Sequence, residues 1–384
     1  MAPTPPRPGQ HAVYTSSELR LVDLCRLLAQ AGFDVGPTRP IRRSVLDTFD
    51  GRLYAAGLQL EFREVPEGEL VLVGGGPIAA RVAVERAPTF ATDLPPGAFS
   101  ARLASLLEVR ALLPKPNRRG PLCRRAPGRR REGPGRRVVH GGLVVDETRI
   151  DTPACTAEVD AMEGYPKAAE RASTLLSSLG LHRHSADMPG MLAEQAGVDL
   201  RGYAGSPTVA LERDEAALDG FRRVLVNLAD AMAANWAGTI DDVDSEFLHD
   251  LRVAVRRTRS VLSEAKRILP DDVRAHHRSE FRWLGTITSP ARDLDVYLIE
   301  WDGYVEPLGP DVARALRPVV DHISGQRDIA HVALAEALRS DRYVQLMAGW
   351  RAWLTTADPE QLGREARRPL GAVAGRRIAL AQPN

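Results

Sequence analysis

Apolar and polar residues alternate in short runs along the first half of this chain. Alternation at every second position is typical of strands that bury one face. The runs fall at residues 44–49, 58–63, 70–73, 81–85, 138–139, 143–145 and 157–160. Turns such as Asp50-Gly51 separate the runs, so we expect consecutive hairpins in an antiparallel sheet or barrel.

In the second half of the chain, apolar residues instead recur every three or four positions, which is the period of an amphipathic helix. Helices are expected at residues 214–236, 244–269, 271–288, 292–304, 311–338 and 341–354, after earlier ones at 18–28 and 167–180. The predicted fold class is α+β, with a β-rich N-terminal domain and an all-helical C-terminal domain.

Composition indicates the domain boundaries along the 384 residues. Residues 1–12 are rich in proline and are expected to be disordered, and the glycines of residues 182–207 indicate a linker. The β-rich domain then spans residues 13–181 and the helical domain residues 208–384. No apolar run approaches the roughly 18 residues of a membrane helix, and the N-terminus lacks the apolar segment of a secretory signal. We therefore expect a cytoplasmic protein without a membrane partner.

Lysine and arginine are concentrated in two segments, although the net charge of the chain is only +1. Residues 115–137 hold ten Lys and Arg residues and one acid, and residues 249–292 hold ten against five acids. Basic segments in an otherwise acidic chain favour polyanionic partners. A solvated loop and a solvated helix face are the alternative interpretation.

The helix expected at 244–269 carries an apolar stripe and, about 100° away, a basic stripe. The basic stripe consists of His249, Arg252, Arg256 and Arg259, with Arg257 beside it. The next helix has a basic stripe of its own, formed by Arg274, Arg278 and Arg282. Two such helices packed antiparallel would line a groove with guanidinium groups, which bind phosphate oxygens in pairs.

Residues 246–262, EFLHDLRVAVRRTRSVL in one-letter code, resemble the signature of the CHAD family of helical histidine-bearing domains. Residues 281–285 and 291–296 are similar to that family's following helices. The resemblance implies an all-α fold of two repeated four-helix units, with a basic surface that binds inorganic polyphosphate. The binding residues that it implies are His249, Arg252, Arg256, Arg257, Arg259, Arg282 and Arg292.

The second repeat of such a domain would carry another histidine-and-arginine helix, and none follows Leu354. We therefore expect a CHAD-like domain truncated to little more than its first half. The apolar faces meant for the missing half would be exposed, and exposed apolar patches above a few hundred Å² usually bind a partner. Self-association through the helices after Asp311 is the expected result.

Residues 46–63, LDTFDGRLYAAGLQLEFR, resemble the CYTH family of triphosphate tunnel proteins, which are often fused ahead of CHAD. Residues 157–160 and the helix after them resemble that family's closing strand and helix. The resemblance implies an antiparallel barrel whose tunnel holds triphosphate and a divalent metal.

The resemblance further implies that catalysis depends on an early Glu-x-Glu-x-Lys strand, since hard cations need several oxygen ligands. That strand is absent, and no lysine occurs before Lys115. We therefore expect a degenerate, non-catalytic barrel without a cofactor. Glu158 and Asp160 lie on one face of a strand and are candidates for a metal site. A metal-dependent triphosphate hydrolase that uses them with Glu61 is the alternative.

The basic segment at 114–137 is rich in proline and glycine, which predicts a loop rather than a helix. Such a loop can contact any polyanion through counterion release, so non-specific binding of RNA or DNA backbones is a further alternative. The segment has no aromatic residue for base stacking. Our leading hypothesis is a non-catalytic protein that binds inorganic polyphosphate, in the cytoplasm and at polyphosphate granules where these occur.

Overall fold

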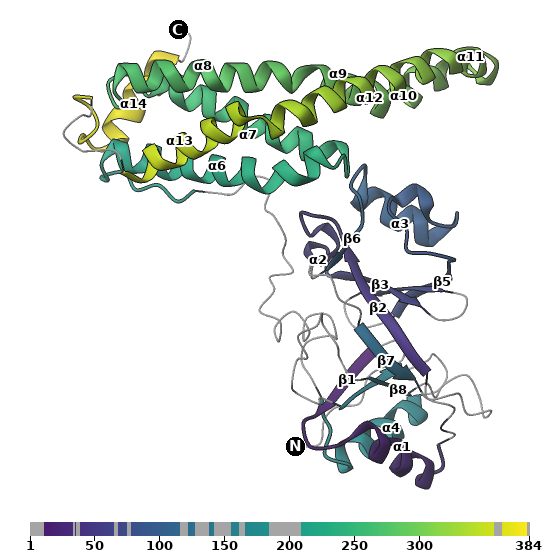
Figure 1. Cartoon of the computed structure of the whole chain (residues 1–384). Coiled ribbons are helices and arrows are strands. Elements are labelled where there is room, and N and C mark those ends of the chain that lie inside the picture. The colour runs from purple at the N-terminus through teal and green to yellow at the C-terminus, as the bar shows by residue number, and fades with distance from the viewer. Residues whose placement is uncertain are drawn as a thin grey trace. The chain divides into compact units, whose positions relative to one another are not determined.

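The computed structural model describes residues 11–33, 35, 39–64, 68–74, 78–115, 122–126, 138–141, 155–160, 166–183, 209–356 and 363–381. The chain divides into two compact units, Met1–Tyr203 and Ala204–Asn384. The first unit contains the strands and the second is helical (Figure 1). This division confirms the expected β-rich and helical parts, while most of the expected linker lies outside the described residues.

The larger sheet of the first unit has six antiparallel strands in the order β5-β4-β3-β2-β6, with β7 also paired to β2. These are β2 (Arg39–Asp47), β3 (Leu58–Glu64), β4 (Glu69–Gly74), β5 (Ile78–Ala83), β6 (Leu113–Lys115) and β7 (Leu122–Ala126). Leu60 and Leu70 on one face pack with Leu103 of α3 (Ala98–Leu107) in a buried cluster. The other helical segments here are α2 (Arg52–Ala55) and η1 (Ala91–Asp93).

The smaller sheet has four antiparallel strands in the order β10-β1-β9-β8. Its strands are β1 (His11–Ser16), β8 (Val138–Gly141), β9 (Cys155–Asp160) and β10 (His182–Arg183), and two helices, α1 (Leu21–Gln30) and α4 (Pro166–Ser178), pack against it. Tyr14 and Val159 are buried here with Leu24 of α1 and Leu176 of α4. β1 therefore begins within the segment 1–12 that was expected to be disordered, because its side chains enter this core.

The expected closed barrel is not found among the described residues. The described buried residues form one cluster on each sheet, together with the helices that pack on that sheet. Part of the segment expected to be a basic loop is also strand, because the backbones of β6 and β7 pair with the edge of β2. The rest of that segment lies outside the described residues.

The second unit is built from helices joined by short turns. They are α6 (Ala217–Ile240), α7 (Ser245–Glu264), α8 (Asp271–Ile287), α9 (Ser289–Ile299), α10 (Trp301–Val305), η2 (Glu306–Leu308), α11 (Pro310–Ala315), α12 (Arg317–Arg339), α13 (Asp341–Thr356) and α14 (Leu370–Ala381). All the helices predicted between residues 214 and 354 are present, and two of them are divided, at Glu300 and at Leu316. Among the described helices, none combines the length and apolar character needed to span a membrane.

Close packing holds α6, α7, α8 and α13 together. A Cβ atom on Gly238 of α6 would lie 2.3 Å from the ring of Phe247 on α7, so only glycine allows this contact. Between α8 and α13, the rings of His277 and Trp350 have centroids 4.5 Å apart, and Phe281 completes the aromatic cluster. These buried contacts fix the positions from which α7 and α8 present their basic residues.

A partly buried charge network joins α12 to the rest of the unit. The Nε atom of Arg327 donates to Asp295 of α9 at 2.7 Å, and both terminal nitrogens bond the carboxylate of Asp242 between α6 and α7. Burial raises the pKa of Asp295 above its ordinary value. The network thus connects α12 to α9 and to the turn between α6 and α7.

Candidate functional site

An N-cap residue fixes where α7 begins, and the burial of its apolar stripe fixes which face of the helix is exposed. The side chain of its N-cap residue, Asp244, accepts hydrogen bonds from the backbone N–H groups of Glu246 at 2.9 Å and Phe247 at 3.2 Å. Its apolar stripe is buried, including Leu251 and Val255. The helical period therefore places the basic stripe at the edge of this buried face and in solvent beyond it.

Arg252, at the start of the basic stripe, is half-buried and bonded to the next helices. Its Nη1 atom donates to the carbonyl of Gly285 at 3.3 Å, to Thr288 Oγ1 at 3.0 Å and to Ser289 Oγ at 2.9 Å. Burial lowers the pKa of Arg252 from its ordinary value. This arginine joins α7 to the α8–α9 junction through its Nη1 atom, and its predicted contact with phosphate stays a prediction.

His249 and Arg292 form a second connection between helices. Arg292 Nη2 lies 3.0 Å from His249 Nδ1, and Arg292 Nη1 donates to the carbonyl of Ser245 at 3.1 Å. An arginine can only donate, so Nδ1 of the histidine accepts and the ring proton of the neutral form is on Nε2. Both predicted binding residues are therefore engaged between α7 and α9.

Farther along α7, the structure brings four arginines to one cavity between α7 and α8. Its volume is about 400 Å³, and its lining consists of Arg256, Arg259, Ser260, Ser263, Glu264, Arg278 and Arg282. The two helices run antiparallel, since Arg252 near the start of α7 bonds the end of α8. We call this the arginine cavity.

The four arginines of the arginine cavity are exposed. Within the described part of the chain, their guanidinium groups have no carboxylate or hydrogen-bond partner. Glu264 contributes a carboxylate to the lining of the cavity. Four cations close together repel one another, and a bound anion would reduce that repulsion.

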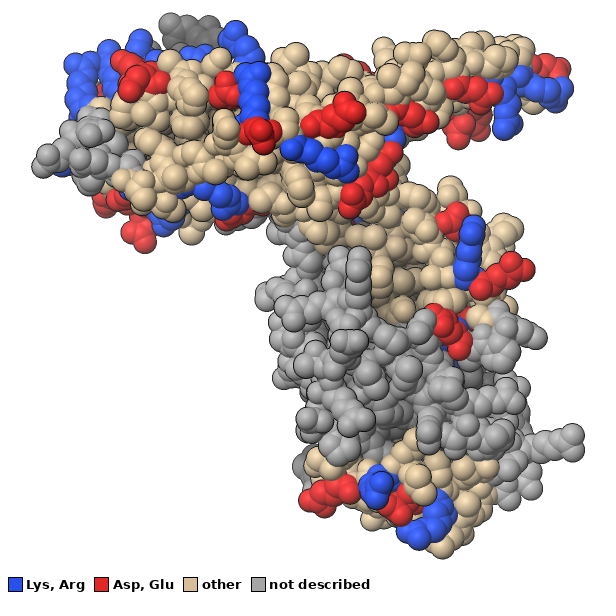
Figure 2. Space-filling view, viewed as in Figure 1, with Lys and Arg blue, Asp and Glu red and all other residues tan. Residues whose placement is uncertain are grey.

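The arginine cavity contains Arg256, Arg259 and Arg282 of the predicted residues, and also Arg278, which the family resemblance did not supply. The spacing of Arg278 four residues before Arg282 was the signal that identified it. Arg257 is exposed on α7 but does not line the cavity. In the space-filling view, Lys and Arg side chains of the helical unit gather over the end where α8 begins, and they mix with acids along α9–α12 (Figure 2).

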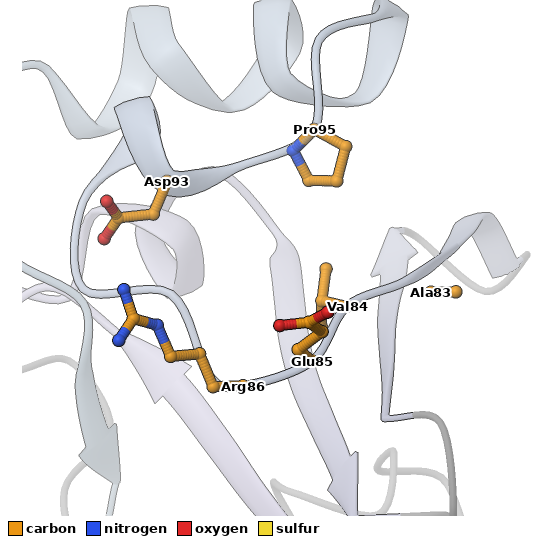
Figure 3. A pocket seen from close by; sticks show the side chains of 6 residues that line it. All are labelled: Ala83, Val84, Glu85, Arg86, Asp93 and Pro95. Carbon is orange, nitrogen blue, oxygen red and sulfur yellow. The ribbon is translucent and has the colours of Figure 1, made fainter.

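A cavity of similar size, about 410 Å³, lies in the first unit beside β5. Its charged lining residues are Glu85, Arg86 and Asp93, and Figure 3 shows Arg86 extending toward the side of the cavity that holds Asp93. The backbone N–H groups of Phe90 and Thr89, which donate to Asp93, lower the pKa of that carboxyl. Its charges are of both signs, so this cavity lacks the cationic character of the arginine cavity.

The acidic residues considered for a metal site lie on two different sheets. Glu61 on β3 is buried and paired with Arg63, with 2.6 Å between Oε2 and Nη2. Glu158 and Asp160 belong to β9 of the smaller sheet, where they pair with residues of β1. Among the described side chains, no group of three or more His, Cys, Asp or Glu residues is placed to hold a metal ion. The expected lack of triphosphate hydrolysis stays a prediction, and the hydrolase stays the alternative.

Comparison with known proteins identifies part of the chain. Residues 223–382 match the family model of the CHAD domain. A crystal structure of the CHAD domain from the plant Ricinus communis is 31% identical over 38% of this chain and 48% of that one, with a TM-score of 0.34. The chain thus spans about half the length of that relative, and no curated protein matches it. Residues 223–382, which hold the arginine cavity, are a CHAD domain.

Proposed function

We propose that this protein binds inorganic polyphosphate through the arginine cavity and does not act as an enzyme. The observation that carries the proposal is the convergence of Arg256, Arg259, Arg278 and Arg282 from two helices on one open cavity of about 400 Å³. Each guanidinium group offers a planar pair of donors that matches two phosphate oxygens. The resemblance to the CHAD family, which implies polyphosphate binding, supports the same conclusion.

The arrangement of the arginines favours a chain of phosphates over a single phosphate ion. Arg278 and Arg282 lie one turn apart on α8, which is about 6 Å along the helix axis, and Arg256 and Arg259 lie about 4.5 Å apart on α7. One phosphate ion does not carry enough charge to neutralise four guanidinium groups. A polymer with roughly one negative charge per phosphate can, and it binds by releasing counterions.

The other predicted residues support this site indirectly. Arg252, His249 and Arg292 hold α7 against α8 and α9 through hydrogen bonds. By fixing the two helices, they keep the arginines of the cavity in register. Their role in the proposal is to position the cavity rather than to contact phosphate.

Titration of the full chain with polyphosphate of defined lengths tests the proposal. The variant Arg259→Ala with Arg282→Ala should lose most of the binding, whereas the matched variant Arg26→Ala with Arg171→Ala, which alters exposed arginines of the first unit, should bind like the parent. Circular dichroism verifies folding in each case. Unchanged affinity of the cavity variant would refute the proposal, and equal affinity for duplex DNA would favour a general polyanion site instead.

A further inference from the structure

A long part of the helical unit has no buried residue. From Glu306 to Ala330, through η2, α11 and the first half of α12, every residue is exposed or intermediate. This segment nevertheless contains apolar side chains that are strongly exposed, among them Leu308 at 55% and Ile329 at 65%. Figure 1 shows it at the end of the hairpin that α12 forms with α9 and α10. Helices of this kind are normally stabilised by burying an apolar face.

The outward face of α12 carries small and apolar residues at its centre, with the exposed carboxylates of Asp321 and Asp328 along one side. Helical geometry places Pro318, His322, Gly325, Ile329 and Val332 on the side opposite the contacts with α9. Val332 is 58% exposed. Contiguous exposed apolar surface on a helix is typical of a contact with another protein.

Gly325 lies at the middle of this face and has no role inside its own chain. A Cβ atom built on it would meet nothing within 4 Å. Glycine inside a helix is destabilising relative to alanine, so its presence here calls for a reason outside the chain. The close approach of a second helix backbone would be such a reason, because it requires a residue without a side chain.

The charged residues on either side of Gly325 are arranged reciprocally. Asp311 lies as many residues before Gly325 as Arg339 lies after it. Arg314 and Glu336 flank Gly325 in the same way, at a shorter separation. Leu316 is the single residue between α11 and α12, and its dihedral angles lie in the right-handed helical region. All four charged residues are exposed.

We infer that the outward face of α11–α12 binds a second copy of this chain, antiparallel and centred on Gly325. A two-fold pairing of this kind brings the same patch of each copy together. Arg314 of one copy then lies opposite Glu336 of the other, and Asp311 opposite Arg339. A parallel pairing would instead place like charges together.

Sedimentation equilibrium of the full chain at micromolar concentration tests the inference. The parent should be dimeric, and Ile329→Glu should shift it to monomer. The matched variant Val344→Glu on α13, where Val344 is 55% exposed, should remain dimeric. Gly325→Leu should raise the thermal stability of the monomer, because no atom of the same chain lies near the new side chain. The same substitution should weaken the dimer, because the side chain would collide with the partner helix.

A charge exchange distinguishes this pairing from other contacts. Arg314→Glu alone should weaken the dimer at least several-fold, and adding Glu336→Arg in the same chain should restore it, since each copy then supplies both reversed charges. A monomeric parent, or association unchanged by Ile329→Glu and by Arg314→Glu, would overturn the inference. The arginine cavity is untouched by these variants, so polyphosphate binding can fail or persist independently.

Discussion

The Nη1 atom of Arg259 on α7 lies 3.1 Å from the position that a Cβ atom on Gly285 of α8 would take. The guanidinium group therefore crosses α8 where that helix carries no side chain. Since the contacting atom is the end of a flexible side chain, a substituent at Gly285 would displace Arg259 rather than the backbone. Gly285 thus shapes the arginine cavity without lining it.

The first prediction concerns this glycine. We expect Gly285→Leu to lower the affinity for polyphosphate by about tenfold, or ~1.4 kcal/mol, because the new side chain displaces Arg259 from the cavity. Isothermal titration measures the loss. Gly349→Leu, at an exposed position where a Cβ meets nothing within 4 Å, is the control. Parent-like binding by Gly285→Leu would mean that Arg259 does not contribute.

A second prediction separates the structural arginine from the binding arginines. Arg252→Ala should lower the free energy of unfolding by about 1–3 kcal/mol, because it removes three hydrogen bonds to a half-buried cation. Urea denaturation measures this loss. Arg256→Ala should leave stability within about 0.5 kcal/mol, as is usual for an exposed side chain without such contacts. Equal stability of the two variants would contradict the assignment.

The ionic strength dependence of binding provides a third prediction. Affinity for polyphosphate should fall as salt rises, and each cavity arginine that is removed should reduce the slope of log affinity against log salt by roughly 0.7. The slopes of the parent and of Arg278→Ala, measured between low and physiological salt, test this. A parent slope near zero would show that released counterions do not drive binding.

Acid should destabilise the helical unit through His277, which is buried against Trp350. Burial lowers the pKa of His277 from 6.5 to about 4. Between pH 6.5 and 4, the His277 side chain binds a proton in the unfolded chain but stays neutral in the folded one. The free energy of unfolding therefore falls as the pH drops from 6.5 toward 4. The expected loss between pH 7 and 5 is about 2 kcal/mol. Urea denaturation of His277→Phe should show a flatter pH profile, and an identical profile would contradict this account.

The last prediction concerns hydrolysis. With magnesium or manganese we expect no release of phosphate from triphosphate above background, because the early Glu-x-Glu-x-Lys strand is absent. A colorimetric phosphate assay measures it. Metal-dependent release that disappears on combining Glu158→Ala with Asp160→Ala would instead support the hydrolase alternative.

The sequence by itself determined the helices and the basic stripe. The period of three and four residues along 244–354 depends only on local geometry, and it predicted α7, α8 and α13 within a few residues. The resemblance to the CHAD family could likewise be recognised from the sequence, since the residues of its motif are close together in the chain. For the strands, alternation located β3 and β4, and the expected consecutive hairpins are confirmed from β2 to β5. Alternation did not predict that β6 and β7 both pair with β2.

Only the tertiary structure decided which arginines share a cavity. Spacing places Arg252 and Arg259 on one face of α7. In the structure, Arg252 donates a hydrogen bond to the end of α8, whereas Arg259 lines the arginine cavity. That difference arises from where α8 crosses α7, and the crossing depends on buried contacts distant in sequence. The alternating pattern likewise did not predict that the described strands form two sheets, each with its own cluster of buried residues.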